Sequence, residues 1–141
     1  MGSRLEEPLV VYRIADSRHP IFDPTGAFLK GGRWNSKGRR VLYAAKTYAG
    51  ALLETLAHSN IGKVPPTFAY IEITLPAGAL VEEVRATEIA GWNSDDLIAS
   101  RAAGDLWHTE RQSLALFVPS AVTGGIEWNV LSMPIMWNTG M

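Results

Sequence analysis

Short stretches in which apolar and polar residues alternate, or in which apolar residues cluster, predict several β-strands along the chain. The predicted strands are Pro8–Ile14, Val41–Ala45, Thr67–Leu75, Ala79–Val84, Leu114–Val118 and Ile126–Leu131. The alternation in residues 67–75 is typical of a strand with one face in water, whereas residues 41–45 are uniformly apolar and are expected to be buried. Gly124-Gly125 predicts a hairpin turn between the last two strands.

Helical spacing is clearest after Thr47, which offers an N-cap for a helix that reaches about His58. Apolar residues spaced for one helix face predict a buried stripe made of Ala49, Leu52, Leu53 and Leu56. A weaker helical pattern covers Asp95–Arg111, where Gly104 is expected to separate two short helices. Residues 23–40 are rich in Gly and basic residues and are expected to form a loop with one short extended piece. Short strands around a few helices predict an α+β fold.

Composition narrows the classes of function. A chain of 141 residues that is 47% hydrophobic is expected to form one domain with one core. The net charge of -1, without a long run of like charge, argues against nucleic acid as the ligand. The absence of cysteine excludes thiolate nucleophiles and cysteine-based zinc sites, and the spacing of His19, His58 and His108 predicts no metal site. No apolar run predicts a membrane span and no signal-peptide pattern is present, so we expect a cytoplasmic protein.

The segment Gly31-Gly32-Arg33-Trp34-Asn35 is the most unusual in the chain. Two glycines allow a ligand to approach the backbone closely, and Arg33 adds a permanent planar cation, a combination that suits a diphosphate. A plain glycine turn, with Arg33 on the surface and Trp34 covering the core, is the alternative that these residues leave open.

Glu54 lies off the apolar stripe of its predicted helix, on a face that carries Gly50 and Ala51 one turn earlier and His58 one turn later. Small neighbours leave room beside the carboxylate, which makes Glu54 a candidate catalytic residue. The spacing alone favours the simpler alternative of a solvated helix face with a Glu–His pair.

Three further candidates each have a structural alternative. Tyr43, within a short apolar strand, could be an aromatic platform or a core tyrosine with a satisfied hydroxyl. Ser120, at the end of an apolar strand after Pro119, could face a cleft or form a turn. Gly104-Asp105-Leu106-Trp107 favours a helix start, with Asp105 as cap and Trp107 packed in the core.

In order along the chain, these segments resemble the RES domain, a family named for its arginine, glutamate and serine. The matching stretches are Val11-Tyr12-Arg13-Ile14, Gly31-Gly32-Arg33-Trp34-Asn35, Val41-Leu42-Tyr43-Ala44-Ala45, Leu52-Leu53-Glu54 with His58, Gly104-Asp105-Leu106-Trp107 and Val118-Pro119-Ser120. The domain would span residues 9–138, after an N-terminal extension of residues 1–8 in which Met1-Gly2-Ser3 has the composition of a cloning remnant. The family usually continues with Asn-Pro and a nearby histidine, whereas this chain has Ser132-Met133-Pro134 and no later histidine.

The resemblance implies an ADP-ribosyltransferase-like split β-sheet that frames a cleft for NAD⁺, which is a substrate. It implies catalytic roles for Arg33, Tyr43, Glu54 and Ser120. Arg33 would bind the diphosphate, Tyr43 would stack near the nicotinamide, Glu54 would stabilise positive charge that develops on the ribose, and Ser120 would hold substrate or orient Glu54. The expected binding residues are Arg33, Tyr43, Asn35, Arg13 and Ser120.

The resemblance also implies a biological role. The protein would be the toxin of a bacterial type II toxin–antitoxin system, neutralised by an Xre-like antitoxin. A homodimer of the toxin within that complex is compatible with the resemblance. Cleavage of the nicotinamide–ribose bond by hydrolysis or phosphorolysis would deplete NAD⁺ and arrest growth. A mono-ADP-ribosyltransferase that modifies a cellular protein is the first alternative, and a non-catalytic module that binds NAD⁺ or a partner is the second.

Overall fold

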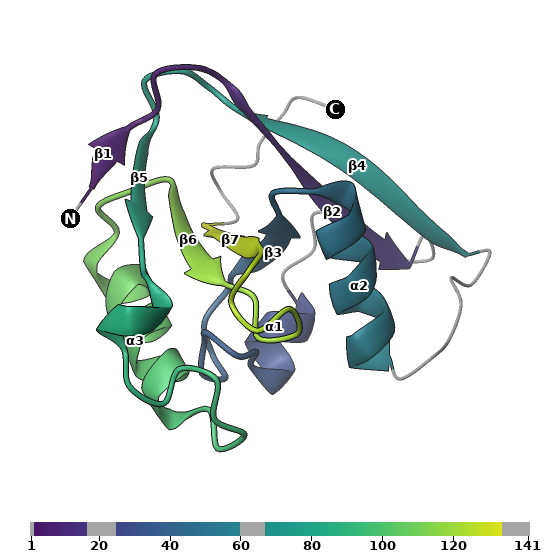
Figure 1. Ribbon diagram of the computed structural model, residues 1–141, viewed down its shortest axis with the longest axis vertical. Coiled ribbons are helices and arrows are strands. Elements are labelled where there is room, and N and C mark those ends of the chain that lie inside the picture. Colours follow the sequence, from purple (N-terminus) through teal and green to yellow (C-terminus); the bar gives the residue numbers. More distant parts are fainter. Residues whose placement is uncertain (1, 17–24, 60–66, 134–141) are drawn as a thin grey trace.

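The computed structural model describes residues 2–16, 25–59 and 67–133, and its centre is a seven-stranded mixed sheet. The strands are β1 (Ser3–Arg4), β2 (Leu9–Asp16), β3 (Leu42–Ala45), β4 (Phe68–Leu75), β5 (Leu80–Glu83), β6 (Ala115–Pro119) and β7 (Trp128–Ser132). Their order is β1-β5-β6-β7-β3-β2-β4 (Figure 1). The helices are α1 (Thr25–Lys30), α2 (Tyr48–Ser59) and α3 (Ile98–Glu110), with a short 3₁₀ helix, η1 (Ala86–Glu88).

The sheet divides between β2 and β3. These strands share a single residue pair, Tyr12 with Ala45, whereas β2 and β4 pair antiparallel along their whole length. On the other side, β3, β7 and β6 form a continuous antiparallel block, and β5 joins β6 in parallel. The β2–β4 ribbon therefore diverges from the rest of the sheet, and α2 lies beside it in Figure 1. This is the α+β architecture with a split sheet that was predicted.

Two groups of buried side chains stabilise the two faces of the sheet. One group is built on β2, β3, β6 and β7 and includes Val11, Ala115 and Val130, each 0% exposed. The other places Trp34 and Trp107 against Leu116 and Leu131, and so joins the segment after α1 and helix α3 to the sheet. Burial of large apolar side chains on this scale is the main force that holds the layers together.

Helix α3 is continuous, so the predicted break at Gly104 and the helix start at Asp105 are wrong. Gly104 is buried in the middle of α3, and a Cβ there would lie 1.7 Å from the carbonyl oxygen of Trp34. The glycine is thus needed for close packing between the helix and another segment, which sequence periodicity does not reveal. Asp105 binds Ser36 through its side chain, while Asp96 accepts the hydrogen bond from the first helical N–H, that of Ile98.

Residues 23–40, predicted as a loop, contain helix α1 in their described part. Gly31, with φ +76°, ends this helix, and its N–H donates to the carbonyl of Ala27. The Arg40 guanidinium lies 4.2 Å from the centre of the Phe28 ring. Such a short helix depends on tertiary contacts rather than on its own propensity, which explains why the sequence pattern missed it.

The apolar stripe predicted for α2 is also wrong in part. Ala49 and Leu53 are exposed, whereas Gly50 and Ala51 are buried. A Cβ on Gly50 would lie 2.9 Å from Thr47 Oγ1 and 3.3 Å from Glu127 Oε1, so small residues permit the close approach of this helix to its neighbours. The predicted N-cap is confirmed, because the Gly50 N–H donates to Thr47 Oγ1 over 2.9 Å.

The predicted strands are present with bounds that shift by a few residues, and β6 and β7 form the predicted antiparallel hairpin. The N-terminal extension contributes to the sheet, since Ser3 and Arg4 pair with Val81 and Leu80 of β5. Within the described ranges, no helix is both long enough and apolar enough to cross a membrane. Most of the atypical segment after Leu131 lies outside the described residues, because these end at residue 133. His19 and the side chain of His58 also lie outside them.

Candidate active site

A pocket of about 850 Å³ lies beside the divide in the sheet. Helices α1, α2 and α3, strands β2, β3 and β7 and the segment after β6 all contribute to its wall. Among the described residues that line it, the charged ones are Arg13, Lys30, Arg33, Arg101 and Glu54. A single carboxylate thus faces a surplus of cations, which favours an anionic ligand.

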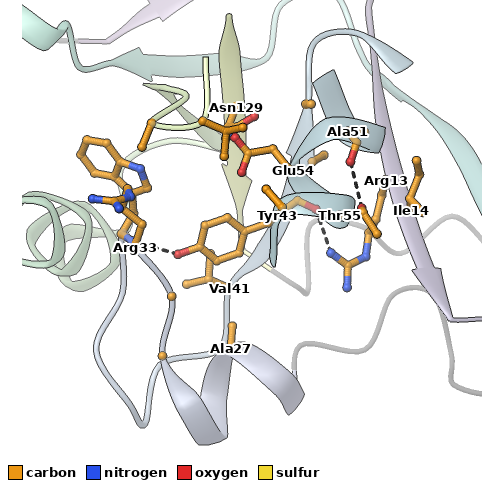
Figure 2. Close-up of a pocket in the computed structure, with 18 of the residues that line it drawn as sticks. Arg13, Ile14, Ala27, Arg33, Val41, Tyr43, Ala51, Glu54, Thr55 and Asn129 are labelled. Atoms are coloured by element: carbon orange, nitrogen blue, oxygen red, sulfur yellow. Dashed lines mark hydrogen bonds between the residues drawn. The ribbon is translucent and has the colours of Figure 1, made fainter. Parts of the chain in front are cut away.

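Glu54 is held at a defined position in this pocket. Ser120 Oγ donates a hydrogen bond of 2.5 Å to Glu54 Oε1, and Asn129 Nδ2 donates another of 3.0 Å to the same oxygen. Both bonds reach a carboxylate oxygen from a neutral donor, so they fix the orientation of the group without neutralising its charge. Figure 2 shows Glu54 and Asn129 pointing toward one another, with the Tyr43 ring beside them.

The two donors come from the β6–β7 hairpin. Ser120 directly follows β6 and is 1% exposed, and its N–H donates to the carbonyl of Glu127 on the returning arm. Asn129 lies on β7, where it pairs with Val118 of β6. The sequence prediction included Ser120 but missed Asn129. The available signal was an amide residue between the apolar residues Trp128 and Val130, a polar position that needs a hydrogen-bonding partner when it faces inward.

Tyr43 presents its ring to the pocket while its hydroxyl is held in the protein. The hydroxyl donates to Asn35 Oδ1 over 2.6 Å and accepts the Trp34 N–H over 3.1 Å. Burial raises the pKa of Tyr43 well above its ordinary value of 10.0, although the hydrogen bond from Trp34 and the nearby charges of Arg101 and Arg33 oppose the rise. The hydroxyl therefore stays protonated, and the ring is the part available to a ligand.

Asn35 is 0% exposed and is not among the pocket-lining residues. Its Nδ2 donates to the carbonyls of Ala27, Ser36 and Arg39 at 3.0 to 3.4 Å. Asn35 is therefore a positioning residue, because its side chain connects α1 to the segment that follows and accepts the hydrogen bond from the Tyr43 hydroxyl.

The arginines at the pocket are fixed by backbone carbonyls. Arg33 Nη1 donates to Trp92 O over 3.3 Å and to Ser94 O over 3.1 Å, and Arg13 Nη1 donates to Tyr43 O over 2.7 Å. Figure 2 shows Arg33 and Arg13 on opposite sides of Tyr43. Arg101 of α3 also lines the pocket, and Arg101 and Lys30 were missed because neither lies in a recognisable motif.

This arrangement can bind a polyanion and stabilise positive charge beside it. Cations around a Gly-Gly turn suit phosphate oxygens, while an oriented carboxylate stabilises an electron-poor centre that forms during a reaction. In the part of the chain that the structure describes, no group of three His, Asp or Glu side chains is placed to hold a metal ion.

Comparisons with known proteins identify the family of this chain. The model of the RES domain family matches residues 10–136. A protein of Sphingobium sp. named Prs ADP-ribosylating toxin is 34% identical over 113 residues, which cover 77% of this chain and 70% of that protein. A protein of Photorhabdus laumondii named Toxin Res is 30% identical over 130 residues, which cover 90% of this chain and 83% of that protein.

A solved structure gives the same fold. The crystal structure of the M. tuberculosis MbcT–MbcA toxin–antitoxin complex contains a chain that superposes with a TM-score of 0.73 at 15% sequence identity, covering 96% of this chain and 79% of that one. At that identity the likeness concerns the fold alone. The family match and the curated relatives confirm the resemblance that the sequence predicted, and the chain therefore belongs to the RES-domain family.

Proposed function

We propose that this protein is a toxin that binds NAD⁺ and breaks its nicotinamide–ribose bond. The observation that carries the proposal is the Glu54 carboxylate, held by Ser120 and Asn129 in a pocket whose other charged side chains, among the residues that the structure describes, are cations. The family match and the toxins among its relatives support the same function. NAD⁺ has the matching chemistry, because it combines a diphosphate with a ribose that becomes electron-poor as the bond to nicotinamide breaks.

The pocket residues divide binding from chemistry in this proposal. Arg33 binds the diphosphate by charge-assisted hydrogen bonds, and Arg13 adds positive potential from the opposite side of Tyr43. The Tyr43 ring contacts the nicotinamide, with its hydroxyl locked by Asn35. Ser120 acts by orienting Glu54, and Asn129 shares that task.

Glu54 stabilises the oxocarbenium-like transition state. The bond between ribose C1′ and the nicotinamide nitrogen breaks, and its electron pair leaves with nicotinamide, which neutralises the ring nitrogen. The carboxylate of Glu54 offsets the positive charge that develops on the ribose. An incoming oxygen then bonds to C1′ and loses its proton to solvent. The leaving group needs no protonation, so this mechanism requires neither a general acid nor a metal ion.

The acceptor defines two versions of the function. In the first, water or inorganic phosphate accepts the ADP-ribosyl group, so that cellular NAD⁺ falls and growth stops. In the second, a protein side chain accepts it, and the 34% identity to a relative named Prs ADP-ribosylating toxin favours this version. A non-catalytic binding module is the third candidate, and the hydrogen-bonded carboxylate in the pocket speaks against it.

The proposal includes a protein partner. We propose an Xre-like antitoxin encoded beside the toxin, in a type II system that acts in the cytoplasm. The similarity of fold to a chain from a toxin–antitoxin complex supports such a partner. A cation-lined pocket is most directly blocked by a partner segment that carries a carboxylate.

The experiment that tests the function uses purified protein and NAD⁺, with and without phosphate. Release of nicotinamide together with ADP-ribose supports hydrolysis, and a phosphorylated ADP-ribose formed only with phosphate supports phosphorolysis. A parallel incubation with lysate and labelled NAD⁺ detects ADP-ribose attached to protein. Absence of nicotinamide in every reaction would overturn the proposal in favour of a binding module.

A further inference from the structure

Arg101 lies in the pocket wall on the second turn of α3, opposite the Gly31-Gly32 turn. Its Nε donates a hydrogen bond of 2.8 Å to Gly32 O, and the preceding residue, Ser100, donates from Oγ to Arg33 O over 2.6 Å. Two consecutive side chains of α3 therefore hold two consecutive carbonyls of the turn. This contact fixes Arg101 and Arg33 relative to one another.

The turn is shaped around the Arg101 guanidinium. Gly31 has φ +76°, and a Cβ there would lie 2.9 Å from Arg101 Nη2 and 3.0 Å from Asn35 O. A Cβ on Gly32 would lie 2.6 Å from the Tyr43 hydroxyl. Both glycines are thus required by close packing, and the one at residue 31 leaves the space that Arg101 Nη2 occupies.

Arg101 keeps most of its hydrogen-bonding capacity. A guanidinium has five N–H donors, and the bond to Gly32 uses only the one on Nε. Among residues 2–16, 25–59 and 67–133, no carboxylate lies within ion-pair distance of Arg101. The acidic residue one turn further along α3, Asp105, pairs with Arg39 instead, at 3.2 Å. Arg101 is therefore an oriented cation in a pocket, with donors left for a ligand.

We propose that Arg101 is a second diphosphate-binding residue, which acts with Arg33 as a clamp built on the Gly31-Gly32 turn. This inference rests on the proposed function, because it names the residues that hold the phosphate groups of the same substrate. A diphosphate has enough oxygens for two guanidinium groups at once, and two fixed cations bind it more tightly than one. Arg101 contributes to binding, whereas Glu54 contributes to the chemical step.

The test measures binding without turnover. ADP-ribose and inorganic pyrophosphate are titrated by calorimetry into the parent protein, Arg101→Gln, Arg101→Lys and Arg111→Gln. Arg111 is the matched control, because it is an exposed arginine that directly follows the same helix and lies outside the pocket. Loss of charge-assisted hydrogen bonds in Arg101→Gln is expected to raise the Kd of both ligands roughly tenfold or more, while Arg101→Lys recovers part of the loss and Arg111→Gln changes neither.

The two proposals fail in different ways. Equal binding of ADP-ribose by the parent protein and Arg101→Gln would overturn the clamp, whatever the enzyme does with NAD⁺. Tight binding of ADP-ribose that depends on Arg101, in a protein that releases no nicotinamide, would leave the clamp standing and overturn the proposed reaction. Nicotinamide carries no phosphate, so its binding shows whether Arg101 has only a structural role. A comparable loss of nicotinamide binding in both Arg101 variants would mean that the turn has collapsed, and this outcome would also overturn the clamp.

Discussion

The two walls of the pocket are built in different ways. The acidic wall consists of Glu54 on α2 and its donors Ser120 and Asn129 on the β6–β7 hairpin, so a carboxylate is oriented by side chains from a sheet. The basic wall consists of the Gly31-Gly32 turn with Arg33, held against α3 by side-chain bonds to backbone carbonyls. One wall places a single charge accurately, and the other wall places several charges through a packed loop.

The two walls are therefore expected to serve different steps of the reaction. A charge that stabilises a developing positive centre matters in the transition state, so changes to the acidic wall are expected to lower kcat. Cations that hold phosphate groups bind substrate and transition state alike, so changes to the basic wall are expected to weaken affinity. A substitution in one wall is expected to leave the function of the other wall largely intact.

The largest effect is expected for Glu54→Gln. Glutamine keeps the length of the side chain and an oxygen that can accept hydrogen bonds, but it removes the negative charge. Turnover of NAD⁺ is expected to fall roughly 10²-fold or more, as for the loss of one preorganised electrostatic group, with little change in the Kd of NAD⁺. Nicotinamide release at saturating NAD⁺, beside calorimetry, separates the two quantities. Turnover near the parent rate would return Glu54 to the role of an ordinary helix residue.

Gly104→Ala disturbs the packing between α3 and the segment after α1, which supports the basic wall. The new Cβ would lie 1.7 Å from Trp34 O, so either α3 or the segment that contains Trp34 must move. Overpacking of this kind is expected to lower the free energy of unfolding by about 1–3 kcal/mol and to weaken binding of ADP-ribose. Urea denaturation measures the first effect. Gly78→Ala is the matched control for the loss of a glycine, because no atom lies within 4 Å of its added Cβ, although its φ of +86° adds strain.

The sequence predicted more of the acidic wall than of the basic wall. Glu54 lies in a helix that was predicted from its N-cap and spacing, and Ser120 lies at the end of a strand that was predicted from an apolar run. The family resemblance then supplied their roles. The continuity of α3 and the presence of α1 were not predictable, because a buried Gly104 and an isolated short helix both depend on tertiary packing. Arg101 and Asn129 were missed for the same reason, since their importance comes from partners far away in sequence.

Ser120→Ala and Asn129→Ala test how much the two hydrogen bonds of the acidic wall contribute to catalysis. Each removes one of the two bonds to Glu54 Oε1 and leaves the charge in place. A hydrogen bond to a charged group contributes about 1.5–3 kcal/mol. Because the remaining bond keeps part of the orientation, kcat is expected to fall about tenfold in each variant, the lower end of that range, while the Kd of NAD⁺ stays close to that of the parent. Because both bonds orient the same group, the double variant is expected to lose less than the product of the single losses. An increase in Kd without a fall in kcat would contradict the positioning role.

The smallest effect on turnover is expected for Tyr43→Phe, which keeps the ring at the junction of the two walls. Loss of the hydroxyl leaves the Asn35 Oδ1 acceptor and the Trp34 N–H donor without their partner, at a cost of about 1–3 kcal/mol in the free energy of unfolding.

Tyr43→Phe also changes the pH dependence of stability. Burial raises the pKa of Tyr43 in the folded state above its ordinary value of 10.0, so the folded state binds the proton more tightly than the unfolded state does. The stability that this provides is fully present below about pH 10 and is lost as the pH rises further. Urea denaturation of the parent protein and Tyr43→Phe on both sides of that pH is expected to show a steeper loss in the parent. Equal slopes would mean that the Tyr43 hydroxyl titrates as it does in the unfolded chain, and the burial that raises its pKa would then not hold in solution.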